Sequence, residues 1–106
     1  MRVAQVIGRV TLSLHEPAFK GGRWLVCSPL DADQFHGACG SRPKVSSQSS
    51  LVAYDHLGAG PGDIVGVVEG AEATAPFENP TPVDAFNACL IDTFFYQPPT
   101  GPAAAK

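Results

Sequence analysis

Residues 57–63, LGAGPGD, are the chain's clearest candidate for phosphate chemistry. A glycine-rich turn that cradles phosphate leaves a strand and opens a helix, whose N-terminal amides and dipole hold the anion. Here the next residues, IVGVVEG, are rich in β-branched side chains and predict a strand, and Asp63 stands where a GxGxxG motif needs its last glycine. The pattern disfavours a nucleotide site and favours a tight connection, with Pro61 and Gly62 at the centre of a type II turn.

Side chains that could bind a metal ion gather in one stretch, DADQFHGAC, which contains Asp31, Asp33, His36 and Cys39. A structural zinc site usually has two ligand pairs at close spacing, and the second pair is missing. We therefore expect a solvated loop here, with no metal ion and no cofactor.

Acid–base chemistry is the remaining possibility, and Asp55 and His56 are its nearest candidates. Neighbours on a strand point to opposite faces, and the pattern places no nucleophile beside them. Asp84 and Asp92 lie near apolar runs, where capping or pairing explains a carboxylate as well as catalysis does. We expect no catalytic residues, and hence no enzyme.

Composition indicates one small domain with surplus apolar surface. The chain has 106 residues, of which 44% are hydrophobic and only 16% are charged. Typical domains carry about a quarter charged residues, so contacts between subunits are the natural cover for the excess. The net charge of −3 and the scattered Lys and Arg residues disfavour nucleic acid, and no apolar run is long enough for a membrane. We expect a cytoplasmic location.

Hydrophobic alternation predicts strands along most of the chain. Even positions of residues 4–14 are largely apolar, Gly8 suggests a bulge or bend, and Val3 and Ile7 indicate that the opposite face is covered as well. Further strands are expected over residues 24–28, 51–55, 64–70 and 88–96, with a helical turn over 71–75. Residues 31–50 read as a long exposed loop and 97–106 as a disordered tail.

These elements predict an all-β fold, a small five-stranded OB-like closed barrel over residues 1–96, with at most one short helical turn and antiparallel strands. A small sandwich is the alternative. Cys27 and Cys89 lie in apolar runs and are expected to be buried, whereas Cys39 is expected to be exposed. We expect Phe94, Phe95 and Tyr96 to pack rather than to stack on bases.

Four pieces together resemble a known family: VAQVIGRV, LVAYDHLGAGPGD, IVGVVEGAEA and PVDAFNACLIDT. Their order and spacing resemble the vertex proteins of bacterial microcompartments, the EutN and CcmL family, over residues 1–93. The GAGxGD-type loop and PVDA, residues 82–85, are the specific pieces, while the long 31–50 loop and the tail depart from the family.

The resemblance implies an OB-like barrel that forms a homopentamer at the corners of a protein shell, otherwise built from hexameric shell proteins, in the bacterial cytoplasm. It also implies a structural role, at the subunit interface or five-fold axis, for Val3, Ile7, Gly58, Ala59, Gly60, Pro61, Gly62, Asp63, Pro82, Val83 and Asp84. The alternative is a monomeric OB-type binding module for single-stranded nucleic acid or oligosaccharide; the low basic content disfavours the nucleic-acid version.

Overall fold

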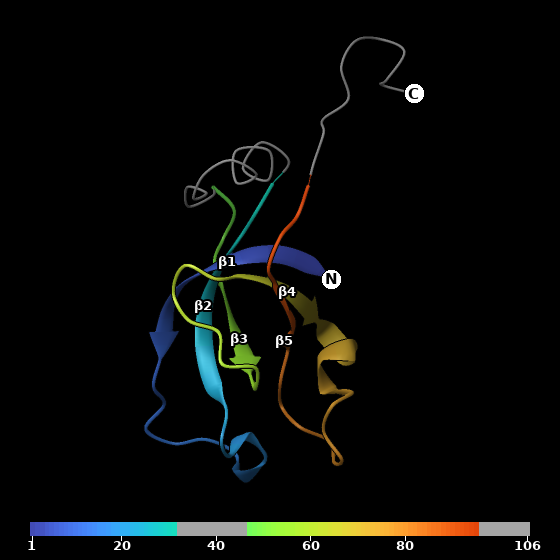
Figure 1. Ribbon diagram of the computed structural model, residues 1–106. Helices are drawn as coiled ribbons and strands as arrows, with labels where there is room; N and C mark the ends of the chain where they lie inside the picture. The colour runs from blue at the N-terminus through green and yellow to red at the C-terminus, as the bar shows by residue number, and fades with distance from the viewer. Residues whose placement is uncertain (32–46, 96–106) are drawn as a thin grey trace.

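The structure is a computed structural model that describes residues 1–31 and 47–95, and its five strands close in a ring (Figure 1). The strands are β1 (Arg2–Val10), β2 (Arg23–Pro29), β3 (Leu51–Asp55), β4 (Ile64–Glu69) and β5 (Ala85–Ile91). Their order around the ring is β1-β2-β3-β5-β4. The predicted all-β class and closed five-stranded sheet are confirmed. The expectation of a wholly antiparallel sheet is wrong, because β3 and β5 run parallel.

Strand β1 bends where the sequence predicts a bulge. Val6 pairs with Cys27 and Gly8 pairs with Val26, so Ile7 is an extra residue on β1. The strand ends at Val10, which pairs with Trp24, whereas the alternating pattern continues to Leu14. Strand β2 begins at Arg23 and offers no partner beyond that point, which leaves Leu14 88% exposed.

Strand β5 begins three residues earlier and ends five residues earlier than its pattern predicts. It pairs with β4 from Ala85 to Ile91 and meets β3 where Tyr54 stands opposite Phe86. Residues 92–95 leave the sheet, and Phe95 is 82% exposed, so the prediction that it packs in this chain is wrong. Tyr96 lies outside the described residues.

Two short 3-10 turns complete the described chain. The turn η2 (Gly70–Thr74) follows β4 as predicted, and η1 (Pro17–Phe19) adds a second turn between β1 and β2. Most of the expected 31–50 loop and all of the expected 97–106 tail lie outside the described residues. Within the described part, no helix is long and apolar enough to cross a membrane.

Small apolar side chains fill the ring, as its narrow interior requires. Fully buried members include Val6, Leu25, Cys27, Ala53 and Val65.

Burial, with a smaller effect from the charge of Asp55, raises the pKa of the Cys27 thiol to about 11. Cys89 is only half-buried, so the expectation of a buried thiol is wrong for this residue in the single chain.

A second cluster is aromatic and centres on Tyr54, which is fully buried. Its ring centroid lies 4.9 Å from that of Phe19 and 5.0 Å from that of Trp24. The Tyr54 ring also rests on the backbone of Gly22, where a Cβ would overlap the ring. The absence of a side chain at Gly22 therefore makes room for Tyr54, the largest fully buried side chain among the described residues.

Gly22→Ala should lower the free energy of unfolding by about 1–3 kcal/mol, because either Tyr54 or the backbone must shift. Urea titration followed by tryptophan fluorescence measures the change. Gly8→Ala is the matched control, since its Cβ would meet Val26 at an ordinary 3.9 Å. Equal urea midpoints for the two variants would contradict the close packing of Tyr54 on Gly22.

Candidate functional site

The glycine-rich loop is organised by the carboxylate of Asp55, which is 1% exposed at the end of β3. Its oxygens accept hydrogen bonds from the backbone amides of Leu57, Gly58 and Ala59, at 3.0, 2.9 and 2.9 Å. A fourth donor is the side-chain amide of Asn87, at 2.9 Å. Four donors occupy the carboxylate, so Asp55 acts as a structural acceptor rather than as an acid–base partner of His56.

Asn87 joins this loop to the strand that closes the ring. It is fully buried on β5, and besides donating to Asp55 it accepts a hydrogen bond from the backbone amide of Cys89, at 3.3 Å. A buried amide and a buried carboxylate that satisfy each other avoid the cost of unpaired polar groups. The pair was missed from the sequence, where the only signal is one polar residue within the apolar run AFNACLI.

The second half of the loop is the tight turn that the sequence predicts. The amide of Asp63 donates to the carbonyl of Gly60 at 3.0 Å, and Gly62 has a φ of 98°, as the third residue of a type II turn requires. The Asp63 carboxylate accepts a further bond from the amide of Gly60, at 2.9 Å. A carboxylate thus holds each half of the loop.

Two backbone hydrogen bonds tie this turn to the bulge in β1. The amide of Gly62 donates to the carbonyl of Val6 at 2.8 Å, and the amide of Val6 donates to the carbonyl of Asp63 at 2.9 Å. The structure therefore brings the predicted site residues 60–63 beside Ile7, which is 38% exposed. Ala59 differs from its neighbours in the loop, because it is buried in the ring core.

Residues 82–84 lie at the opposite end of β4, and Val3 pairs with Gly66 within that strand. The loop enters β4 at Ile64, whereas the carbonyl of Asp84 accepts a bond from the amide of Gly70, just beyond Glu69, at 2.8 Å. Val83 is 7% exposed and belongs to the aromatic cluster, while Pro82 and Asp84 face solvent. Val3 is half-buried on β1. Apart from Val3, the predicted site residues thus fall into two regions, one at each end of β4.

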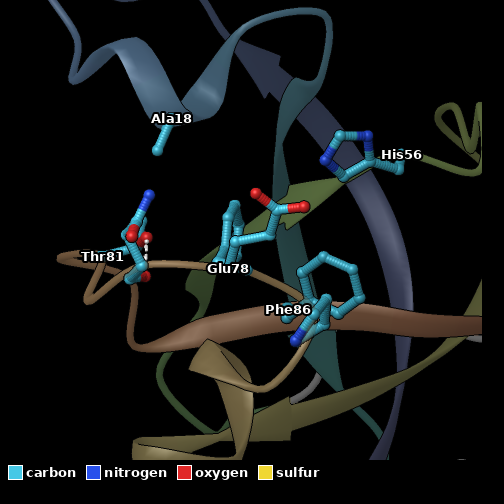
Figure 2. A pocket seen from close by; sticks show the side chains of 8 residues that line it. Ala18, His56, Glu78, Thr81 and Phe86 are labelled. Carbon is cyan, nitrogen blue, oxygen red and sulfur yellow. Dashed lines mark hydrogen bonds between the residues drawn. The ribbon is translucent and has the colours of Figure 1, made fainter.

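A pocket of about 550 Å³ lies between η1, His56, residues 76–81 and β5 (Figure 2). The His56 ring packs edge-on against Tyr54 at 4.8 Å, and the Thr81 hydroxyl donates to the carbonyl of Asn79 at 2.8 Å. Across the described residues, His56 has no hydrogen-bonded hydroxyl or thiol that it could activate as a nucleophile. His56 contacts aromatic rings, those of Tyr54, Phe77 and Phe86.

Most of the metal-ligand candidates lie beyond the part of the chain that the structure describes. Asp33, His36 and Cys39 lie outside the described residues, and Asp31 alone of that set is included. Within residues 1–31 and 47–95, no three His, Cys, Asp or Glu side chains gather closely enough to hold a metal ion.

Comparison with known proteins identifies the family of this chain. The family model described as "Ethanolamine utilisation protein EutN/carboxysome" matches residues 1–92. The chain belongs to this EutN/CcmL family. The match spans all five strands and the glycine-rich loop, as the resemblance in the sequence predicts. A search of curated proteins found no match.

Solved structures of similar proteins agree with membership of the EutN/CcmL family. CcmL of Gloeobacter violaceus is 31% identical with a TM-score of 0.68, and the alignment covers 91% of this chain and 90% of that one. The pentameric microcompartment shell protein GrpN of Rhodospirillum rubrum is 25% identical with a TM-score of 0.69. The alignment covers 92% of this chain and 100% of the GrpN chain. EutN of Escherichia coli, 24% identical with a TM-score of 0.68 and coverage of 87% and 85%, shares the fold.

Asp55→Asn should lower the free energy of unfolding by about 2–4 kcal/mol, because the new amide presents donors to backbone amides that need acceptors. Urea titration at neutral pH measures the change. Asp63→Asn is the control, since that exposed carboxylate accepts a single loop bond and its loss should cost less than about 1 kcal/mol. Similar midpoints for wild type and Asp55→Asn would contradict the organising role of Asp55.

Proposed function

We propose that this protein is a structural shell component that forms homopentamers at the vertices of a bacterial microcompartment, without catalysing a reaction. The observation that carries the proposal is the agreement of the whole fold with shell proteins of this family. The alignment with GrpN, a pentameric microcompartment shell protein, covers 100% of the GrpN chain. CcmL of Gloeobacter violaceus supports the same assignment at 31% identity.

Apolar side chains exposed on the single chain provide the driving force for assembly. Ile7, Val52, Leu57 and Leu90 are each between 38% and 49% exposed. Burying such surface against a neighbour releases roughly 25 cal/mol per Å² of apolar area. In a cyclic ring each contact joins one patch on one copy of the chain to a different patch on the next copy. The angle between the two patches on each copy therefore sets the number of copies in the ring.

The turn at residues 60–63 is the segment of the loop that we assign to the contact between subunits. A Cβ at Gly60 would meet no atom within 4 Å in the chain itself. Its backbone also lies outside the positive-φ region that favours glycine. Neither packing nor conformation within the protomer requires a glycine there. This supports the proposal that a neighbouring subunit comes close to Gly60, either at a pairwise contact or around the five-fold axis. Ala59 and Val83, being buried, shape the two proposed contact regions from within.

The expected partners are further copies of this chain and hexameric shell proteins, in the bacterial cytoplasm. The alternative of a monomeric OB-type module for nucleic acid or oligosaccharide has less support, because the net charge is −3 and the family match is to shell proteins. A gel shift with single-stranded DNA at low salt separates the two, and tight binding by a monomer would favour the alternative.

Ile7→Asp should convert the assembled protein to monomers, because it places a charge on a surface that we expect a neighbour to cover. The side chain is already 38% exposed in the single chain, so the protomer itself should remain folded. Sedimentation velocity measures the oligomer and circular dichroism the fold. Ile7→Val, which keeps the apolar surface, is the control. A sedimentation profile like that of wild type would count against burial of Ile7.

Gly60→Val should weaken the pentamer at dilution while leaving the protomer's free energy of unfolding within about 0.5 kcal/mol of wild type. The added side chain has free space within its own chain, so any loss of assembly reports on the neighbour. Light scattering across a dilution series measures the effect. Gly60→Ala, with a smaller side chain, should cause a smaller loss. Full pentamers for Gly60→Val at every dilution would refute the contact.

A further inference from the structure

A second pocket, which the proposed function does not use, is positively charged. Its volume is about 730 Å³, within the range of small-molecule sites. The lining comes from the end of β1, the connection through η1 and the start of β2, and includes Arg9, His15 and Arg23. The described lining contains no carboxylate, although the whole chain carries a net charge of −3.

The strand register places Arg9 and Arg23 as diagonal neighbours on adjacent strands. Arg9 pairs with Leu25 across the β1–β2 ladder, and Arg23 lies two residues before Leu25 on β2. Diagonal neighbours of this kind share one face of the sheet, with Cα atoms about 7–8 Å apart. The two residues are 14 positions apart in the sequence, so the fold creates a basic pair that composition does not reveal.

Neither arginine forms a salt bridge with an acidic side chain of the described chain. Arg2, by contrast, pairs with Glu69 at 2.6 Å, and no such bridge forms at Arg9 or Arg23 among the described residues. Asp55 stands opposite Arg23 in the β2–β3 register, but its oxygens accept the loop amides and Asn87. Glu16 is the carboxylate nearest in sequence to His15, and it lies outside the lining.

The rest of the lining suits a small polar ligand. His15 donates through Nδ1 to the carbonyl of Glu16 at 3.0 Å, which leaves Nε2 without a protein partner among the described residues. Phe19 and Trp24, with ring centroids 4.8 Å apart, provide an apolar wall. Two guanidinium groups are matched to the oxygens of phosphate or carboxylate groups, which they can bind in bidentate fashion.

We infer that this pocket binds a small oxyanion, a phosphate or carboxylate group, between Arg9 and Arg23. A free inorganic anion and an anionic metabolite both present this chemistry. The site lies on each protomer and is independent of the vertex assignment, so an assembled shell protein would carry one copy in every subunit.

The test is isothermal titration of the assembled wild-type protein with inorganic phosphate and, separately, with succinate, at constant ionic strength. Saturable binding of either anion supports the site, and the tighter of the two identifies the preferred group. No saturation by either anion below about 10 mM would overturn it.

Variants locate the binding. Arg9→Gln and Arg23→Gln should each weaken it about tenfold or more, while Arg23→Lys, which keeps the charge but not the fork geometry, should weaken it less. Lys20→Gln is the charge-matched control, because Lys20 adjoins the pocket in sequence without lining it. Equal losses for Lys20→Gln and Arg23→Gln would overturn the site in favour of diffuse attraction.

Light scattering on the same variants keeps this result separate from the proposed assembly. We expect Arg9→Gln and Arg23→Gln to keep the wild-type oligomer while losing the anion. Loss of the oligomer in either variant would overturn the inference, because the arginines would then serve a carboxylate of a neighbouring subunit.

Discussion

The buried carboxylate of Asp55 is the interaction on which the rest of this structure depends. It ends β3, gathers three consecutive amides of the glycine-rich loop and receives the side chain of Asn87 from β5. The same two strands form the one parallel pair described in the ring. A buried charge is stable only when its hydrogen bonds are complete, so the loop and the ring closure hold each other in place.

The hydrogen bonds to Asp55 direct the glycine-rich loop toward β1, and the loop ends beside the bulge in that strand. Backbone bonds between Val6 and residues 62–63 fix the turn next to Ile7, at a place where β1 carries one extra residue. A rigid turn and a partly exposed apolar side chain thus lie on one surface. A chain of 106 residues buries only about two-thirds of its unfolded surface, so leaving such a surface uncovered suits assembly better than a solitary domain.

Local patterns predict the local features of this protein well. Glycine and proline chemistry indicates the turn at Gly62 and the bulge near Gly8, and an apolar run marks residues 51–55, the bounds of β3. The features that the sequence does not predict depend on residues far apart in the chain. The bounds of β5 follow from its neighbours in the ring, and the Asp55–Asn87 bond joins residues 32 positions apart.

The candidate site residues also divide into those that local sequence indicates and those that depend on distant contacts. The sequence names the turn and Ile7 as separate candidates and does not reveal that they lie side by side, that PVDA lies at the other end of β4 or that Val83 is buried. The basic pair of Arg9 and Arg23 is likewise invisible before strand register is known. Whether neighbours cover the proposed surfaces is a property of several chains and stays a prediction.

Native mass spectrometry of the purified wild-type protein tests the central claim most directly, because it counts the chains in the assembly. Five copies of the 11.1 kDa chain predict one dominant species of about 55 kDa that persists on dilution. A stable species of one chain at high protein concentration would contradict the account.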